Sequence, residues 1–117
     1  MGMKIERESL KSFGFHGLEI RDYTAGREGS SSMAEVTVPA GARHARAWSK
    51  RSDKYYYVID GKLSFIVDNQ ILNLSSGDVC IIHQGTRFSY ENQTGEIAKL
   101  LIVHTPSFEL AEEIFEE

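Results

Sequence analysis

The chain has 117 residues, of which 41% are hydrophobic and 26% are charged, as is typical of one folded domain with a core of its own. Thirteen Lys and Arg residues against seventeen Asp and Glu residues give a net charge of −4, which argues against a nucleic-acid partner or an anionic membrane surface. No apolar run approaches the roughly 18 residues of a membrane span, and no signal peptide is recognised. The single cysteine, Cys80, excludes an intrachain disulfide. We therefore expect one cytoplasmic domain over residues 1–117, with no membrane or nucleic-acid partner.

Short strands separated by turns follow one another along most of the chain. Residues 24–32 are polar and rich in Gly and Ser, and they predict a surface loop. Residues 33–38 alternate, with Ala34, Val36 and Val38 on one face. Residues 55–59 are aromatic and β-branched, and the Asp60-Gly61 pair after them is a strong hairpin signal. Further strands are predicted at residues 62–67, 71–74, 79–82, 88–90 and 98–104. Such a series is typical of a β-sandwich or β-barrel.

The last residues have a different pattern, which predicts a short helix over residues 107–117. Ser107 is a suitable N-cap, and acidic residues follow it in the first turn. Phe108, Ala111 and Phe115 share one helical face, so this helix is expected to lie against the strands.

Two glycine-framed segments resemble the two sequence motifs of the cupin superfamily. The first extends from Gly41 to Gly61 and the second from Gly77 to Asn92, with the glycines and the asparagine at the motif positions. The resemblance covers about residues 33–105. It implies a single RmlC-like cupin domain, which is an all-β, antiparallel jelly-roll barrel.

In cupins, three histidines and one glutamate from these motifs hold a divalent metal. The matching positions here are Ala47, Ser49, Lys54 and Phe88. A methyl group and a phenyl ring offer no lone pair, a hydroxyl is a weak ligand, and an ammonium repels a cation. We therefore expect no metal and no cofactor.

An alternative register treats His44-Ala45-Arg46 as a degraded His-x-His. A metal held by His44 and His83 would then restore a metal-dependent oxygenase or isomerase. His16 and His104 lie outside both motifs. In the favoured register no histidine is expected in the interior of the domain.

Strand parity predicts a ligand pocket at the position of the family's metal site. Lys54 and Tyr56 share the inward face of one strand, and Phe88 and Tyr90 share that of another. With Ser49 at the mouth, these five are the candidate ligand-binding residues, and no catalytic role is assigned. Phe88 is also expected to fill the vacated metal position. Lys54 has three open roles. It could contact an anionic group of a ligand, or act as a base or Schiff-base nucleophile. In a structural role, it would extend out of the barrel mouth or pair with a carboxylate such as Asp53 or Glu91.

A metal-free cupin that binds a small organic acid or a sugar derivative is the leading functional hypothesis. The alternative is a metal-independent sugar isomerase, epimerase or lyase that uses Lys54, Tyr56 and Tyr90 for proton transfer. The lack of an expected interior histidine weighs against that alternative. A metal-dependent dioxygenase and a purely structural dimer are ranked behind both.

The outward face of the same strand is also apolar. Tyr55, Tyr57 and Trp48 are predicted to point away from the interior, with Ile59 close by. An apolar outer face on a small barrel is usually covered by another surface, so a homodimer is expected.

Overall fold

The computed structural model describes residues 2–27 and 29–117, so that Glu28, in the predicted loop, lies outside the described residues. Apart from two single 3-10 turns, η1 (Arg7–Ser9) and η2 (Leu110–Glu112), the regular structure is β. Within the described residues no helix is long and apolar enough to cross a membrane. The strands are β1 (Phe13–Phe15), β2 (Leu18–Asp22), β3 (Ser32–Val38), β4 (Arg43–Ser49), β5 (Asp53–Asp60), β6 (Lys62–Val67), β7 (Gln70–Ser75), β8 (Val79–Ile82), β9 (Phe88–Glu91), β10 (Ala98–Thr105) and β11 (Glu113–Phe115).

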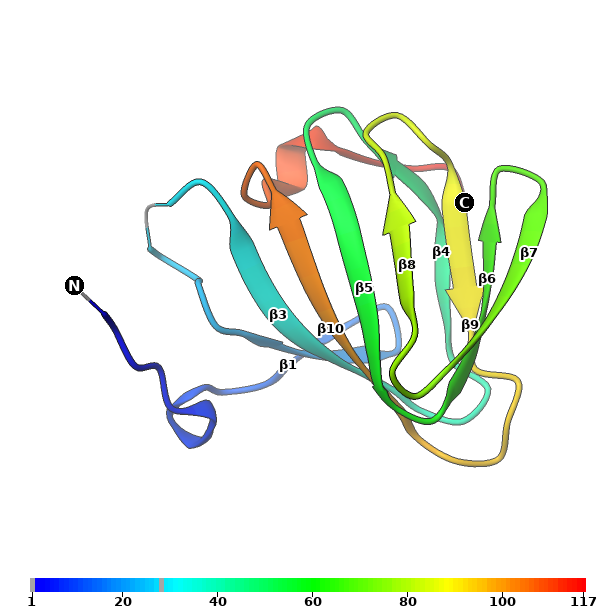
Figure 1. The fold of residues 1–117 in the computed structure, drawn as a ribbon, viewed down its shortest axis with the longest axis horizontal. Coiled ribbons are helices and arrows are strands. Elements are labelled where there is room, and N and C mark those ends of the chain that lie inside the picture. The colour runs from blue at the N-terminus through cyan, green and yellow to red at the C-terminus, as the bar shows by residue number, and fades with distance from the viewer. Residues whose placement is uncertain (1, 28) are drawn as a thin grey trace.

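Two antiparallel sheets form the two layers of a jelly roll (Figure 1). The first has the strand order β1-β2-β3-β10-β5-β8, and the second has the order β11-β4-β9-β6-β7. The all-β antiparallel fold expected from the sequence is therefore confirmed. The two sheets are not closed into a barrel, because β1 and β8 remain edges of one sheet and β11 and β7 remain edges of the other.

The core lies between the sheets and follows the alternation of the strands. On β5, Lys54, Tyr56 and Val58 are buried, whereas Tyr55 and Tyr57 are exposed on the outside. Successive side chains of a strand point to opposite faces, which explains this pattern. The other buried hydrophobic side chains are Leu18, Val36, Val38, Ala47, Leu63, Phe65, Leu74, Cys80, Ile82, Phe88, Tyr90, Ala98, Leu100 and Ile102.

The predicted C-terminal helix is wrong. Residues 107–117 contain only the turn η2 and the strand β11, which pairs with β4 and forms the edge of the second sheet. A short isolated helix is marginal in water, because few backbone hydrogen bonds offset the cost of starting it. Pairing with β4 instead satisfies backbone groups of both segments and covers an open sheet edge.

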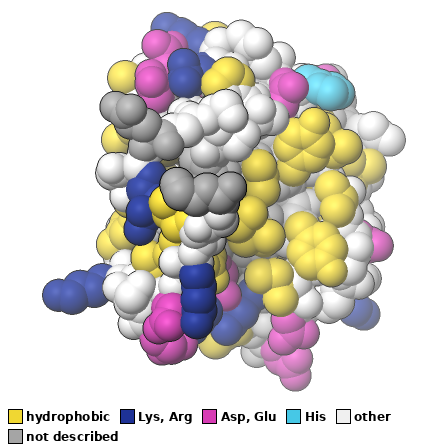
Figure 2. All heavy atoms as spheres, turned by 60° about the vertical axis from the view of Figure 1, so that its left-hand side comes forward, with side chains coloured by type: hydrophobic (Ala, Val, Ile, Leu, Met, Phe, Trp, Pro, Cys, Tyr) yellow, Lys and Arg dark blue, Asp and Glu magenta, His cyan; other side chains and the backbone are white. Residues whose placement is uncertain are grey.

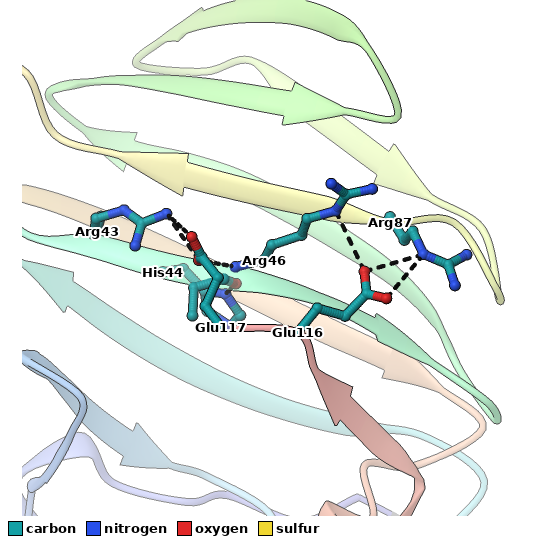
Figure 3. A network of polar contacts seen from close by, with 7 residues as sticks. Arg43, His44, Arg46, Arg87, Glu116 and Glu117 are labelled. Atoms are coloured by element: carbon teal, nitrogen blue, oxygen red, sulfur yellow. Dashed lines mark hydrogen bonds and ion pairs between the residues drawn. The ribbon is translucent and has the colours of Figure 1, made fainter.

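Three arginines hold the end of this strand. Arg43 Nη2 lies 2.9 Å from Glu117 Oε2, and the Arg46 backbone N–H donates to the same oxygen at 2.6 Å. Glu116 accepts from Arg87 Nε at 3.0 Å and lies 3.3 Å from Arg46 Nε (Figure 3). Solvent screens exposed pairs of this kind, so the network orients the last residues without dominating stability.

Candidate functional site

A cavity of about 300 Å³ lies between the two sheets, at the end of the molecule where β1 and β11 form the sheet edges. This volume is at the lower end of the range of about 300–1,000 Å³ that is usual for ligand pockets. Aromatic and aliphatic side chains make up most of its wall, and a few polar groups interrupt them. The lining residues are Phe13, Phe15, Leu18, Ile20, Asp22, Ser32, Met33, Ala34, Val36, His44, Lys54, Tyr56, Tyr90, Ile102, His104, Phe108, Leu110, Glu113 and Phe115.

Three of the five predicted site residues meet in this cavity. Lys54 and Tyr56 reach it from β5, and Tyr90 reaches it from β9 in the opposite sheet. Phe88 is buried behind the wall, with its ring centroid 5.8 Å from that of Tyr56. Ser49 does not line the cavity. Its hydroxyl accepts the Ser52 backbone N–H at 2.9 Å and stabilises the turn after β4.

Contrary to the expectation, two histidines lie in the interior. His44 is on β4, and its ring centroid is 5.1 Å from that of Tyr90. Simple alternation from the buried Ala47 places His44 on the outer face, because the two positions are three apart. The pairing of β4 with β9 is irregular between His44 and Ala47, so that both can face inward.

His104 is the second interior histidine, and the sequence contained a signal for it. On β10 the buried residues alternate as Ala98, Leu100, Ile102 and His104. His104 therefore continues a pattern that three apolar residues establish. His104 was not assigned to the interior from the sequence, because this residue lies outside both family motifs. His83, by contrast, is exposed and lies 3.8 Å from Asp53, so the structure does not bring it to His44.

The His44 ring is held as a neutral imidazole, with one ring nitrogen protonated and the other free to accept a hydrogen bond. Its Nδ1 lies 2.6 Å from the Ala45 carbonyl oxygen, which can only accept, so Nδ1 carries the proton and Nε2 keeps its lone pair. Burial lowers the pKa of His44 to about 4, and the hydrogen bond to Ala45 only partly opposes this. At neutral pH the imidazole is uncharged.

Lys54 forms the centre of a second polar group that joins the two sheets. Its ammonium donates to a carboxylate oxygen of Glu113 on β11 and lies 2.9 Å from His104 Nε2 on β10. Burial lowers the pKa of Lys54, whereas the Glu113 charge and hydrogen bond raise it. Burial is the main cause that lowers the pKa of His104 to about 3, and the Lys54 charge lowers it further. His104 is therefore a neutral imidazole that accepts a hydrogen bond from the Lys54 ammonium. Glu113 was missed because its strand was predicted as a helix.

Both phenols in the cavity stay protonated. Burial raises the pKa of Tyr56 well above its ordinary value, and it also raises the pKa of Tyr90. Their ring centroids lie 5.4 Å apart, and both rings pack on Phe65. The site therefore combines one unprotonated acceptor, His44, with two O–H donors.

The donor set does not fit the divalent metal that cupins commonly hold. Among residues 2–27 and 29–117, no three His, Cys, Asp or Glu side chains come close enough together to hold a metal ion. The Lys54 ammonium donates to both Glu113 and His104, so any metal ion bound by these groups would lie beside a positive charge that repels it.

The two interior histidines predict that stability falls on acidification. Their folded-state pKa values of about 4 and about 3 lie below the ordinary 6.5, so the unfolded chain binds protons that the folded chain does not. Stability should therefore be highest above about pH 6.5 and should decrease as the pH falls toward 4. Urea unfolding at pH 7 and pH 5 measures this decrease. The decrease in stability between pH 7 and pH 5 should be smaller in His44→Gln than in the wild type. In His83→Gln, which alters an exposed ring, the decrease should equal that of the wild type. Equal decreases in all three proteins would contradict the prediction.

Comparison with known proteins places this geometry in context. The family model described as the cupin domain matches residues 34–104. No curated protein matches the chain in sequence.

Solved structures share the fold at low sequence identity. Pac13, a nucleoside dehydratase, is 21% identical with a TM-score of 0.84, over 98% of this chain and 91% of that one. A sugar phosphate isomerase from Silicibacter pomeroyi is 19% identical with a TM-score of 0.76, over 88% and 75%. KdgF from Halomonas sp. is 14% identical with a TM-score of 0.82, over 93% and 97%. Variants of Streptomyces PAC13, with one histidine replaced by glutamine or one of two tyrosines by phenylalanine, were solved with uridine.

Proposed function

Because the chain belongs to the cupin family, with its match over residues 34–104, we propose that the cavity binds a small hydroxylated molecule of the sugar or nucleoside type and transforms it by proton transfer without a bound metal. One observation carries the proposal: an uncharged imidazole, His44, lies beside the protonated phenol Tyr90, which in turn neighbours the phenol Tyr56, and all three line a mainly apolar cavity. A histidine in the cavity is the natural acid–base group at neutral pH. None was expected there from the sequence, and the presence of His44 therefore favours an enzyme over a simple binding module.

The arrangement suits an elimination or an isomerisation. His44 Nε2 would take a proton from a carbon next to a carbonyl group, and the electron pair of that C–H bond would move toward the carbonyl. In an elimination a hydroxyl group then leaves with a proton donated by Tyr56 or Tyr90, and water is released. In an isomerisation a phenol instead protonates the carbonyl oxygen, and the hydroxyl group on the first carbon gives its proton back to that phenolate and becomes the new carbonyl. The proton on His44 then returns to the former carbonyl carbon. The phenols also offer O–H donors for the hydroxyl groups of a bound sugar.

The structural neighbours support this class of chemistry. One is a nucleoside dehydratase and another is a sugar phosphate isomerase. The Pac13 variants solved with uridine replace one histidine or one of two tyrosines, the residue types that meet in the cavity here. Aromatic side chains at the cavity wall, such as Phe15 and Phe115, would suit the planar base of a nucleoside.

Deuterium exchange tests the proposal before the natural substrate is known. The protein is incubated in deuterated water with a panel of sugar aldehydes and ketones, and NMR follows the hydrogen on the carbon next to the carbonyl. The wild type should exchange that hydrogen in at least one compound, and His44→Gln should lose about 100-fold or more of the exchange rate. His83→Gln is the matched control and should exchange like the wild type.

A carrier or sensor of small molecules is the second candidate, because a pocket with few polar groups also suits binding alone. It predicts chemical-shift changes with uridine or sugars and no deuterium exchange in any protein. Binding without exchange would therefore refute the enzymatic proposal and favour this candidate.

We also propose a homodimer through the outer face of the first sheet. Tyr55, Tyr57, Ile59, Val79 and Ile81 are 37–52% exposed there, and Leu101 and Val103 lie beside them on β10. Hydrophobic side chains gather on one face in Figure 2. This outer patch consists of the uncharged residues just named, and a second copy offers the same flat surface in return, as symmetric dimers require.

Tyr57→Lys is expected to produce a monomer, because it places a charge beside Val79 in the centre of the outer patch. Analytical ultracentrifugation at about 50 μM measures the change, with association of the wild type weakened by about 100-fold or more. Ile71→Lys alters an equally apolar, 65% exposed side chain on the other sheet and should remain dimeric. A monomeric wild type would rule out the dimer.

A further inference from the structure

We propose that Glu113 sets the charge selectivity of the cavity: by occupying the ammonium of Lys54, it makes the site accept uncharged ligands and reject organic anions. The inference rests on the proposed function, because it specifies the substrate class of that same cavity. It also revises the expectation of a small organic acid, which depended on a free Lys54.

The positive charge of Lys54 is already paired, and two of its three N–H donors are in use. Its ammonium donates to the carboxylate of Glu113 and to Nε2 of His104. The faces of the Phe88 and Phe108 rings lie 5.5 Å and 6.0 Å from Nζ. The Lys54 and Glu113 side chains are only 4% and 5% exposed, so bulk water solvates neither charge. An incoming carboxylate would bring a second buried negative charge beside Glu113, and the single Lys54 ammonium cannot neutralise both.

The remaining polar groups of the wall do not supply a positive charge. His44 and His104 are uncharged at neutral pH. Asp22, which also lines the cavity, already accepts from the Thr24 backbone N–H at 3.0 Å and adds a negative charge. The described wall is therefore neutral to slightly negative, whereas a net positive field is what favours a buried organic anion.

The tertiary structure places Glu113 here through the C-terminal strand. Glu113 pairs with Ser49 in the β11–β4 ladder, and the Lys50 backbone N–H donates to the Glu112 carbonyl oxygen at 2.8 Å. Beyond it, Glu116 and Glu117 are held by arginines outside the cavity (Figure 3). The backbone pairing with β4 and the ion pairs of Glu116 and Glu117 thus hold the segment that carries Glu113, and the Glu113 carboxylate lies next to Lys54.

Benzamide and benzoate test the selectivity, because they share one planar shape and differ in charge. NMR titration of the wild type should show benzamide binding at least about tenfold more tightly than benzoate. Glu113→Gln keeps the shape of the side chain and frees the Lys54 ammonium, so its affinity for benzoate should rise by about tenfold or more. Glu116→Gln, on the same segment but outside the cavity, is the control and should keep the wild-type preference.

The double variant Lys54→Met/Glu113→Gln should lose the gain in benzoate affinity, because both charges are removed. If Glu113→Gln does not fold, Lys54→Gln provides the reciprocal test: it leaves the Glu113 carboxylate unpaired and should gain affinity for benzamidine, a cation of the same planar shape. Wild type that binds benzoate as tightly as Glu113→Gln does would overturn the selectivity. A wild type that prefers benzamide to benzoate, but exchanges deuterium into none of the sugar aldehydes and ketones, would contradict the proposed catalysis alone.

Discussion

Lys54→Met is expected to lower the free energy of unfolding by about 3–5 kcal/mol, because it leaves the carboxylate of Glu113 buried without its counter-charge. The two side chains are 4% and 5% exposed, so water cannot replace the lost partner. His104 also loses the donor to its Nε2. The variant therefore removes one hydrogen-bonded charge and leaves two buried acceptors without a donor. Urea unfolding monitored by Trp48 fluorescence measures the loss.

The double variant Lys54→Met/Glu113→Gln is the decisive control for this prediction. It removes both charges, so it should be more stable than Lys54→Met, recovering more than half of the lost free energy. Lys62→Met, on an exposed lysine at the start of β6, should change stability by about 0.5 kcal/mol or less. A Lys54→Met protein as stable as the wild type would show that the pair carries no net interaction.

Phe65→Ala should destabilise the fold by about 3–5 kcal/mol, since the ring is fully buried at the centre of the core. Its centroid lies 4.8 Å from that of Tyr90 and 5.2 Å from that of Tyr56, so it supports both phenols of the cavity. The space left by the ring would allow the phenols to move. Loss of stability should therefore be accompanied by weaker binding of neutral ligands.

Ile66→Ala is the matched control, because Ile66 is the next residue on β6 and its side chain is 43% exposed on the outer face. It should cost about 1 kcal/mol or less and leave ligand binding unchanged. Comparison of the two unfolding curves separates core packing from strand propensity. Equal losses in both variants would contradict the assignment of Phe65 to the core.

Much of the architecture could be predicted because strand alternation is a local property. The pattern on residues 54–58 is sufficient to put Lys54 and Tyr56 on the buried face, and the structure agrees. The glycine-framed motifs identified the family, which the match over residues 34–104 confirms. The same alternation on β10 predicts an inward side chain at His104, a position outside both motifs.

The sequence by itself determined the β-fold, its family, and the inward direction of Lys54, Tyr56 and Tyr90. Only the tertiary structure decided the chemistry of the cavity. An irregular β4–β9 pairing turns His44 inward, and such an irregularity changes strand parity without a recognisable local signal. The pairing of β11 with β4 brings Glu113 to Lys54 across 59 positions of the chain. The charge of a buried group depends on which partners the fold places beside it, and no local pattern records that choice.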